Sequence, residues 1–592
     1  MTGTAPVGRS SRLLLSLAAV AVAFAAADTY VVVLALPDMM SSADLTIDQL
    51  QRGAPIVSGF LLGYIGILPL IGRIADLRGR LPVLVWSLAV FALGSVVTAA
   101  AYDLDSMVVG RFLQGAGGGG LVPATLALVA DLWPAERRGL PLGVVGAVQE
   151  LGSVLGPLLG ALVLAVADWR AIFWVNTAVG LVLAAAILAC RSAGPGTEPP
   201  VQARGRGRPD ALGALLVLVA VVVLAVILRE PRPLVTDVTY GLAFLPVAGD
   251  TRWLSPLALA WYGLLALFVL RQATARRPLL DWRSWPTTAR LTDIPGASLL
   301  ALALAGIIFA FASADPEVQV FSRWGPYLLA ASALAAALFG WRQARARHPL
   351  VPRGALAARP AWGAIVVSFA VGTALVAALV DIPFFARLTA YPDSQLDAAL
   401  VLVRFLAALP VGALLGGWLT RWVDTGWLAS GSMLLAAGGF GWMSTWGVDT
   451  LDSPWATAPL VLTGLGFGGA IAPVNAALLA RTPSDVHGVA SALLVVARMV
   501  GMLVGISALT TIGLRRFYAV ADRIPPIEQL CDGSRVRCDA YDDALLGAGL
   551  AQLEAIFVGA GACALVAAVL ALVTLRESGA SMVPADAPAA FP

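Results

Sequence analysis

The sequence has little charge. Only 13% of its 592 residues are Asp, Glu, Lys or Arg, whereas 59% are hydrophobic, and the mean hydropathy is +0.85. A soluble chain carries about 25% charged residues. The composition therefore excludes an ordinary soluble domain and requires lipid as the solvent. The formal net charge of +3 is small, and we expect no nucleic-acid partner.

Three further absences narrow the function. No GxxxxGK[ST] loop is present, so nothing indicates an ATP-driven motor. His348 and His487 are the only histidines and stand far apart in the chain, which leaves no His-based metal site to predict. No clustered nucleophile or acid/base set falls at a membrane face, so we predict neither an enzyme nor a cofactor.

Long apolar runs dominate what is present. A membrane-spanning helix needs about 20 apolar residues, and the sequence contains sixteen candidates, in groups of six, four and six. These runs predict an all-α polytopic membrane protein. The predicted spans are 13–36, 53–73, 81–101, 106–131, 141–165 and 171–191, then 209–228, 254–272, 294–314 and 324–343, then 361–382, 395–420, 427–447, 456–481, 487–513 and 552–575.

Arginine placement predicts the orientation. Basic loops fall on the same side as the N-terminus, which the positive-inside rule assigns to the cytoplasm of an inner membrane, with both termini inside. The loop at 229–252 is an exception, because its acidic and basic residues cancel. Residues 514–551 then form an external connecting loop that carries Cys531 and Cys538. An oxidising exterior permits a disulfide between them; two free thiols are the alternative.

The four middle spans resemble a duplicated hairpin. The first pair opens with DALG at 210–213 and ends with RQATARRPL at 271–279; the second opens with DIPG at 293–296 and ends with RQARARHPL at 342–350. Internal symmetry is common in transporters. The predicted organisation is an N-terminal six-helix bundle at 1–191, a four-helix linker at 192–350, a C-terminal six-helix bundle at 351–576 and a disordered tail at 577–592.

The loop after the second span carries the first resemblance to a known family. Gly72, Asp76, Gly79 and Arg80 resemble the signature loop of the major facilitator superfamily. The glycines permit a tight turn, and an aspartate near a helix end can engage helix dipoles and arginines, which would hold one conformation. Leu77 replaces the usual basic residue, so we expect a weaker latch.

Two more motifs follow in the expected order. The fourth span resembles the motif of proton-coupled members through Arg111, Gln114 and Gly115, and the fifth resembles the antiporter motif through Gly152, Gly156, Pro157 and Gly160. Ala161 stands where a final glycine is usual. Ordinary packing of small residues is the alternative explanation for each motif alone.

The first span places the chain in a branch of that family. Asp28, followed by Ala35-Leu36-Pro37, is similar to the opening of the fourteen-helix drug:proton antiporters, as are residues 169–176 and 498–505. Tyr30 and Val33 replace polar residues of that branch. This opening and residues 55–65 look closest to mycobacterial exporters of triacylglycerides and related lipids, which work beside a periplasmic lipid-carrying lipoprotein.

Five charged residues stand out inside the predicted spans, where a charge costs about 2.5–3.5 kcal/mol: Asp28, Arg111, Glu150, Arg404 and Arg498. We predict Asp28 as the main proton site, with a structural ion pair as the alternative. Glu150 is either a second proton site or the partner of an arginine. Arg111 would organise the site, because a guanidinium stays charged. We expect Arg404 to pair with a carboxylate across the cavity.

The sequence therefore predicts a monomeric, proton-coupled exporter of lipids or hydrophobic amphiphiles, driven by the proton gradient and embedded in membrane lipid. A multidrug:proton antiporter for cationic or amphipathic drugs is the alternative, because Asp28 and Glu150 could bind a cation.

Overall fold

The structure is a computed structural model that describes residues 9–45, 50–191, 210–248, 251–275, 279, 285–312, 324–392, 394–531 and 538–576. Within these residues it contains helices and no strands, and sixteen helices have 19 residues or more. Fourteen of them are long and apolar enough to cross a membrane. The other two, α12 and α15, are less apolar, because α12 carries two arginines in its last turn and α15 holds five glycines. The predicted all-α polytopic fold is confirmed.

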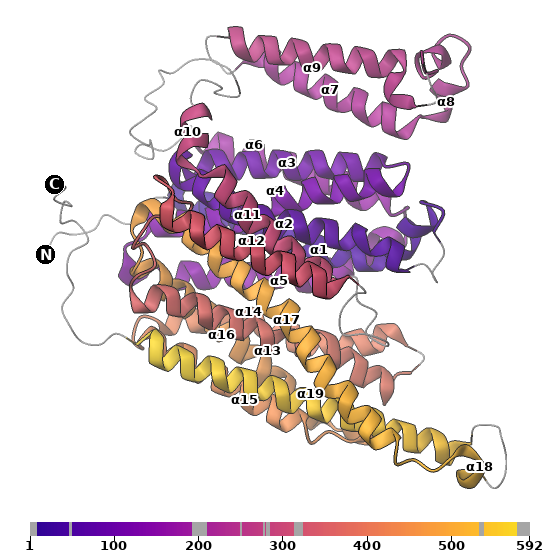
Figure 1. Ribbon diagram of the computed structural model, residues 1–592, viewed down its shortest axis with the longest axis vertical. Helices are drawn as coiled ribbons and strands as arrows, with labels where there is room; N and C mark the ends of the chain where they lie inside the picture. Colours follow the sequence, from indigo (N-terminus) through magenta and orange to yellow (C-terminus); the bar gives the residue numbers. More distant parts are fainter. Residues whose placement is uncertain are drawn as a thin grey trace, which may run out of the picture.

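Six helices form the N-terminal bundle: α1 (Arg9–Ser41), α2 (Leu50–Arg78), α3 (Arg80–Ala100), α4 (Leu104–Leu132), α5 (Gly139–Leu164) and α6 (Arg170–Arg191). Six more form the C-terminal bundle: α13 (Arg359–Leu388), α14 (Gln395–Leu419), α15 (Thr425–Met443), α16 (Thr457–Ala480), α17 (His487–Ala521) and α19 (Asp539–Thr574). The two bundles lie one above the other in Figure 1.

The two bundles use the same packing scheme. In the first, α4 packs on α2 and α3, and α1 packs on α5; in the second, α16 packs on α14 and α15, and α13 packs on α17. The bundles meet along two seams, α5 with α14 and α2 with α17, which are equivalent under this repeat. Close approach along these contacts requires small residues. A Cβ on Gly115, for example, would lie 2.1 Å from the backbone oxygen of Phe60.

The linker contains two helical hairpins that pack in different places (Figure 1). The hairpin of α7 (Ala211–Arg229) and α9 (Pro256–Thr274) lies against α3, at the edge of the molecule. In the hairpin of α11 (Ile294–Ala312) and α12 (Gly325–Arg345), α11 contacts both α2 and α17 and so covers one interbundle seam. The division of the chain at 192–350 remains a prediction, and the tail at 577–592 lies outside the described residues.

Matching ion pairs close the two hairpins. Arg271 donates to the Asp210 carboxylate at 2.8 Å, and Arg342 donates to Asp293 at 2.7 Å. Each aspartate side chain is only 2% exposed. A Cβ on Gly213 would lie 2.5 Å from Asp210 Oδ2, and one on Gly296, the corresponding glycine of the second hairpin, would lie 2.3 Å from Asp293 Oδ2. This geometry gives the repeated Asp-x-x-Gly and Arg-Gln-Ala segments a common structural reason.

Short helices connect the long ones. They are α8 (Arg232–Val235), α10 (Trp285–Leu291) and α18 (Ile527–Leu530), together with the 3₁₀ turns Ala135–Arg137, Gly241–Ala243, Arg252–Leu254, Val448–Asp452, Pro454–Ala456 and Ser484–Val486. We call the end of the molecule where α2 meets α3 the α2–α3 end, and the opposite end the α18 end; they lie at the left and right of Figure 1.

The interpretation of 514–551 as a plain connecting loop is wrong. Helix α17 continues to Ala521, and α19 begins at Asp539 rather than near 552, so the pair extends toward α18 (Figure 1). The added part of α19 is rich in alanine and leucine, which favour helix, and it starts with acidic residues that suit a helix N-terminus. Cys531 and Cys538 form a disulfide in this connection.

Candidate functional site

Asp28 lies at the centre of a buried polar network. It sits on α1 with 1% of its surface exposed, and its carboxylate accepts three side-chain hydrogen bonds. Arg111 of α4 donates to Oδ2 at 2.7 Å, Gln114 of α4 donates to Oδ1 at 3.0 Å, and Asn176 of α6 also donates to Oδ1. The structure therefore brings together three elements of the N-terminal bundle around one carboxylate.

The partners of Asp28 hold one another in place. Arg111 also donates to the Gln114 side-chain oxygen, and its guanidinium carbon lies 4.3 Å from the centre of the Phe60 ring. Gln114 in turn donates to the Ser95 hydroxyl at 3.0 Å. Because Arg111 is 1% exposed and Gln114 is fully buried, the Asp28 charge is balanced by a guanidinium rather than by water. A change in the charge of Asp28, such as protonation, would therefore disturb the whole network.

Small residues of α5 set the position of the helix that carries Asp28. A Cβ on Gly152 would lie 2.1 Å from the backbone oxygen of Ala23, and one on Gly156 would lie 2.5 Å from that of Ala27. The contact loosens at Gly160, where the nearest atom is 3.2 Å away. Pro157 is within α5, but its side chain lies outside the described residues. The antiporter-like motif thus packs α5 directly against the backbone that precedes Asp28.

A second group of polar residues lies between the bundles. Glu150 of α5 is half-buried, and its charged neighbour is Arg498 of α17. Both charges act on the hydroxyl of Tyr64 on α2, so the three side chains face the same region. Among the described residues, no hydrogen bond or ion pair joins this group to Asp28. The two carboxylates predicted to carry protons therefore occupy separate environments.

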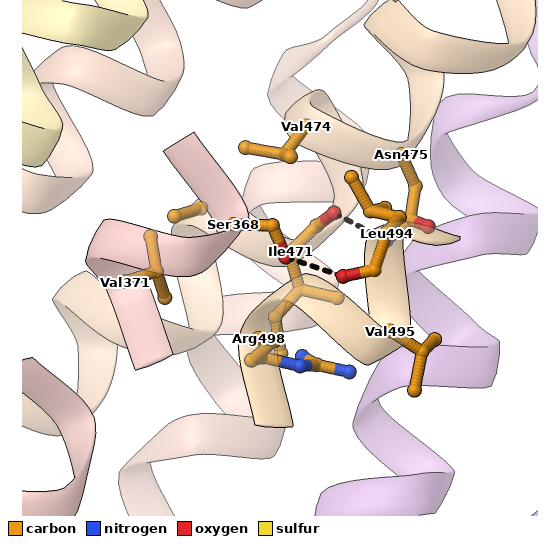
Figure 2. A pocket seen from close by; sticks show the side chains of 9 residues that line it. Ser368, Val371, Ile471, Val474, Asn475, Leu494, Val495 and Arg498 are labelled. Atoms are coloured by element: carbon orange, nitrogen blue, oxygen red, sulfur yellow. Dashed lines mark hydrogen bonds between the residues drawn. The ribbon is translucent and has the colours of Figure 1, made fainter. Parts of the chain in front are cut away.

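Arg498 also borders a cavity inside the C-terminal bundle (Figure 2). The cavity measures about 20 Å³, enough for one water molecule. Ser368 of α13 and Asn475 of α16 line it; the first donates to the Leu494 backbone oxygen at 3.0 Å and the second to that of Ile471 at 2.8 Å. Polar groups of α13, α16 and α17 therefore meet at this cavity, among apolar lining residues.

Arg404 does not have the partner that we expected. Its guanidinium donates to the Thr457 hydroxyl at 3.2 Å, and Thr457 begins α16 of the same bundle. Within the part of the chain that the structure describes, no carboxylate lies within ion-pair distance of Arg404. The expected pair across the cavity is thus replaced by a bond within the C-terminal bundle, because the first turn of α16 lies beside α14.

The α2–α3 loop joins the two bundles. The Asp76 carboxylate accepts the backbone N–H groups of Gly488 at 2.7 Å and Val489 at 3.0 Å, at the start of α17. A helix N-terminus carries unpaired N–H groups and partial positive charge, so it suits a carboxylate. A Cβ on Gly72 would lie 2.6 Å from the Gly488 oxygen, and Gly79 has a positive φ of 91°, which favours glycine.

Arginines add to the contacts between the α2–α3 loop and the start of α17. Arg80 lies 3.2 Å from Asp76 and also donates to the backbone oxygen of Ser484 at 2.9 Å, while Arg73 donates to that of Asp485 at 3.2 Å. We use "latch" for these contacts of the α2–α3 loop with residues 484–489. Residue 77 takes no part in these bonds, so the basic residue that Leu77 replaces is not needed for them. The latch holds the bundles together at the α2–α3 end.

Sequence reasoning gave no role to three buried or half-buried polar residues. Asn176 and Ser95 are polar residues inside apolar spans, which is the signal that could have found them. Asp381 is half-buried on α13. It stands one residue before the end of the predicted span 361–382, whereas α13 continues to Leu388, so it lies further inside the helix than the sequence indicated.

The comparisons with known proteins agree with this architecture. Residues 18–341 match the family model described as Major Facilitator Superfamily. The chain belongs to the major facilitator superfamily. Membership identifies it as a multi-pass membrane transporter, and it confirms the family resemblance carried by the sequence motifs.

Curated relatives in the superfamily are similar along most of the chain. A triacylglyceride transporter of Mycolicibacterium hassiacum is 37% identical over 86% of this chain and 81% of its own length. A triacylglyceride transporter of Mycolicibacterium smegmatis is 35% identical over 85% and 76%, and one of Mycobacterium tuberculosis is 34% identical over 88% and 87%.

Solved structures support the fold alone. The human organic anion transporter MFSD10 aligns with a TM-score of 0.55 at 14% identity, covering 95% of this chain and 99% of its own. The proton:xylose symporter XylE aligns with a TM-score of 0.52 at 13% identity, covering 97% of each chain.

Proposed function

We propose that this superfamily member is a proton-coupled exporter of lipids or lipid-like amphiphiles, with triacylglycerides as the first substrate to test. The observation that carries the proposal is the buried Asp28–Arg111 pair in a chain whose relatives are named triacylglyceride transporters. The apolar replacements Tyr30 and Val33 in the first span are consistent with a hydrophobic substrate.

The proton step in this proposal takes place at Asp28. Protonation neutralises the carboxylate and removes the charge that balances Arg111, so the contact between α1 and α4 weakens. Deprotonation restores it. Glu150, beside Arg498 between the bundles, is the second proton site in this scheme. Each charge that crosses the membrane field contributes about 2.3 kcal/mol per 100 mV.

The conformational step is the opening of the latch. We place the α2–α3 end in the cytoplasm of an inner membrane, because Arg73, Arg80 and Arg138 lie at or near the helix ends there. Breaking the bonds of Asp76 to α17 would let the two bundles separate on that side, and re-forming them would bring the bundles together again. The α18 end would then face the exterior, where a periplasmic lipid-carrying lipoprotein would receive the substrate.

Transport in proteoliposomes tests the proposal. A labelled triacylglyceride is followed under an imposed pH gradient for the wild type, Asp28→Asn and the matched control Glu554→Gln, a carboxylate exposed on α19. We expect gradient-dependent movement in the wild type and control, and none in Asp28→Asn. A parallel assay with a cationic dye examines the multidrug alternative. Movement of the dye but not of the lipid would overturn the lipid assignment, and gradient-independent transport would overturn the coupling.

A further inference from the structure

Helix α11 has three faces with different surroundings. Leu304 and Ile308 are buried against the N-terminal bundle and α17. On the second face, the Ser332 hydroxyl of α12 donates to the Ala303 backbone oxygen at 2.5 Å, and a Cβ on Gly306 would touch α12. The third face, which includes Ile294, Ser298 and Leu302, is exposed.

That third face forms one wall of an open groove between α11 and α12. The groove has a volume of about 510 Å³ and is lined mainly by apolar side chains, including Ile294, Leu302, Leu338 and Trp341. Each of these four is more than 40% exposed. Since α11 is long and apolar enough to cross a membrane, this opening faces lipid rather than water. Its size falls within the range of about 300–1,000 Å³ that is typical of small-molecule sites.

The groove ends in cationic and aromatic groups at the α2–α3 end. Arg342 in its lining is neutralised by Asp293. Arg345, one turn further along α12 and just beyond the lining, is exposed, and no described carboxylate lies within ion-pair distance of it. Its guanidinium carbon lies 5.0 Å from the centre of the Trp341 ring. Tryptophan and arginine together at the end of a membrane helix mark the level of the lipid headgroups.

The first hairpin provides an internal comparison. It has the same Asp–Arg closure, but Leu270 and Thr274 occupy the positions that correspond to Trp341 and Arg345. The Asp–Arg ion pair is therefore sufficient to close a hairpin of this kind, and the fold does not require the tryptophan or the additional arginine. They are the features that would distinguish a binding site from a structural hairpin.

We propose that the groove between α11 and α12 binds one anionic phospholipid from the leaflet at the α2–α3 end. An acyl chain lies along Ile294 and Leu302, and the phosphate lies against Arg345 beside Trp341. The site is separate from Asp28 and the latch, and it does not depend on which substrate is transported. Because α11 covers the seam between α2 and α17, the bound lipid contacts a helix that touches both bundles.

Native mass spectrometry of the full-length protein, titrated with dioleoyl phosphatidylglycerol, tests this site. We expect one saturable adduct in the wild type that binds more tightly than phosphatidylcholine. Arg345→Gln removes one arginine at the membrane interface and should raise the dissociation constant of phosphatidylglycerol about fivefold. Leu302→Trp should remove the adduct by filling the groove.

Two matched controls are available. Arg421→Gln removes an exposed arginine at the end of α14, and Val219→Trp changes the position of α7 that corresponds to Leu302. Both should keep the adduct. Equal binding by all variants, equal binding of the two lipids, or displacement by soluble glycerol phosphate would overturn the proposal. An elution volume in size-exclusion chromatography equal to that of the wild type establishes that each variant is folded.

Discussion

The buried pair of Asp28 and Arg111 gives the sharpest test of the site, through a double-mutant cycle. In Arg111→Gln, the carboxylate stays buried and keeps two amide donors but loses its counter-charge. Breaking a buried pair by removing one partner costs about 3–5 kcal/mol, which corresponds to roughly a 10²–10⁴-fold change in the unfolding equilibrium. Asp28→Asn should cost a similar amount, because it leaves the guanidinium uncompensated.

The double variant distinguishes a charge pair from simple loss of packing. Asp28→Asn with Arg111→Gln leaves neither charge buried, so it should be more stable than either single variant. Unfolding in detergent, followed by tryptophan fluorescence against denaturant, measures all four proteins. Arg404→Gln is the matched control, because Arg404 bonds to a neutral hydroxyl. In that variant, Asp28→Asn should lower the free energy of unfolding by as much as it does in the wild type. A double variant whose losses simply sum would refute the reasoning.

Three further predictions concern the contacts between elements. Asp76→Asn should weaken the bonds to the start of α17. A cysteine introduced between the two bundles should then be labelled faster from the α2–α3 end, and an unchanged labelling rate would contradict the latch. Gly152→Val should destabilise the protein by at least about 1–3 kcal/mol, because its side chain meets the Ala23 backbone, and a melting midpoint equal to that of the wild type would argue against this contact. Hydrogen bonds from Arg271 lower the pKa of Asp210, so the closure of the first hairpin should hold above the unfolded pKa of about 3.9 and be lost as the pH falls through the lower folded value. The rate of protease cleavage next to the hairpin of α7 and α9, measured as a function of pH, reports whether the hairpin is closed. Asp210→Asn should remove the pH dependence of this rate.

Much of the fold could be predicted from local sequence. Each predicted span coincides with a long helix, because a run of about 20 apolar residues is a contiguous signal. The ends were less predictable. Helices α17 and α19 extend past the predicted spans, because charged residues such as Arg515, Arg516 and Asp543 interrupt the apolar run without ending the helix.

The candidate sites, like the fold, could be predicted only in part from local sequence. The motifs placed Arg111 and Gln114 together on α4, where a separation of three residues puts them on one helix face. They did not reveal that Asn176 would complete the Asp28 site, or that Arg404 would bond to Thr457, because those contacts depend on how separate helices pack.

The sequence alone therefore determined the membrane environment, the number and order of the helices, and the family, because composition, apolar run length and short motifs are properties of contiguous residues. Only the tertiary structure decided which charges meet. Asp76 finds its donors 412 and 413 residues away at the start of α17, and Asp28 finds its own on α4 and α6. Pairings of this kind follow from close helix approach at small residues, which places polar groups from distant parts of the chain within hydrogen-bonding distance.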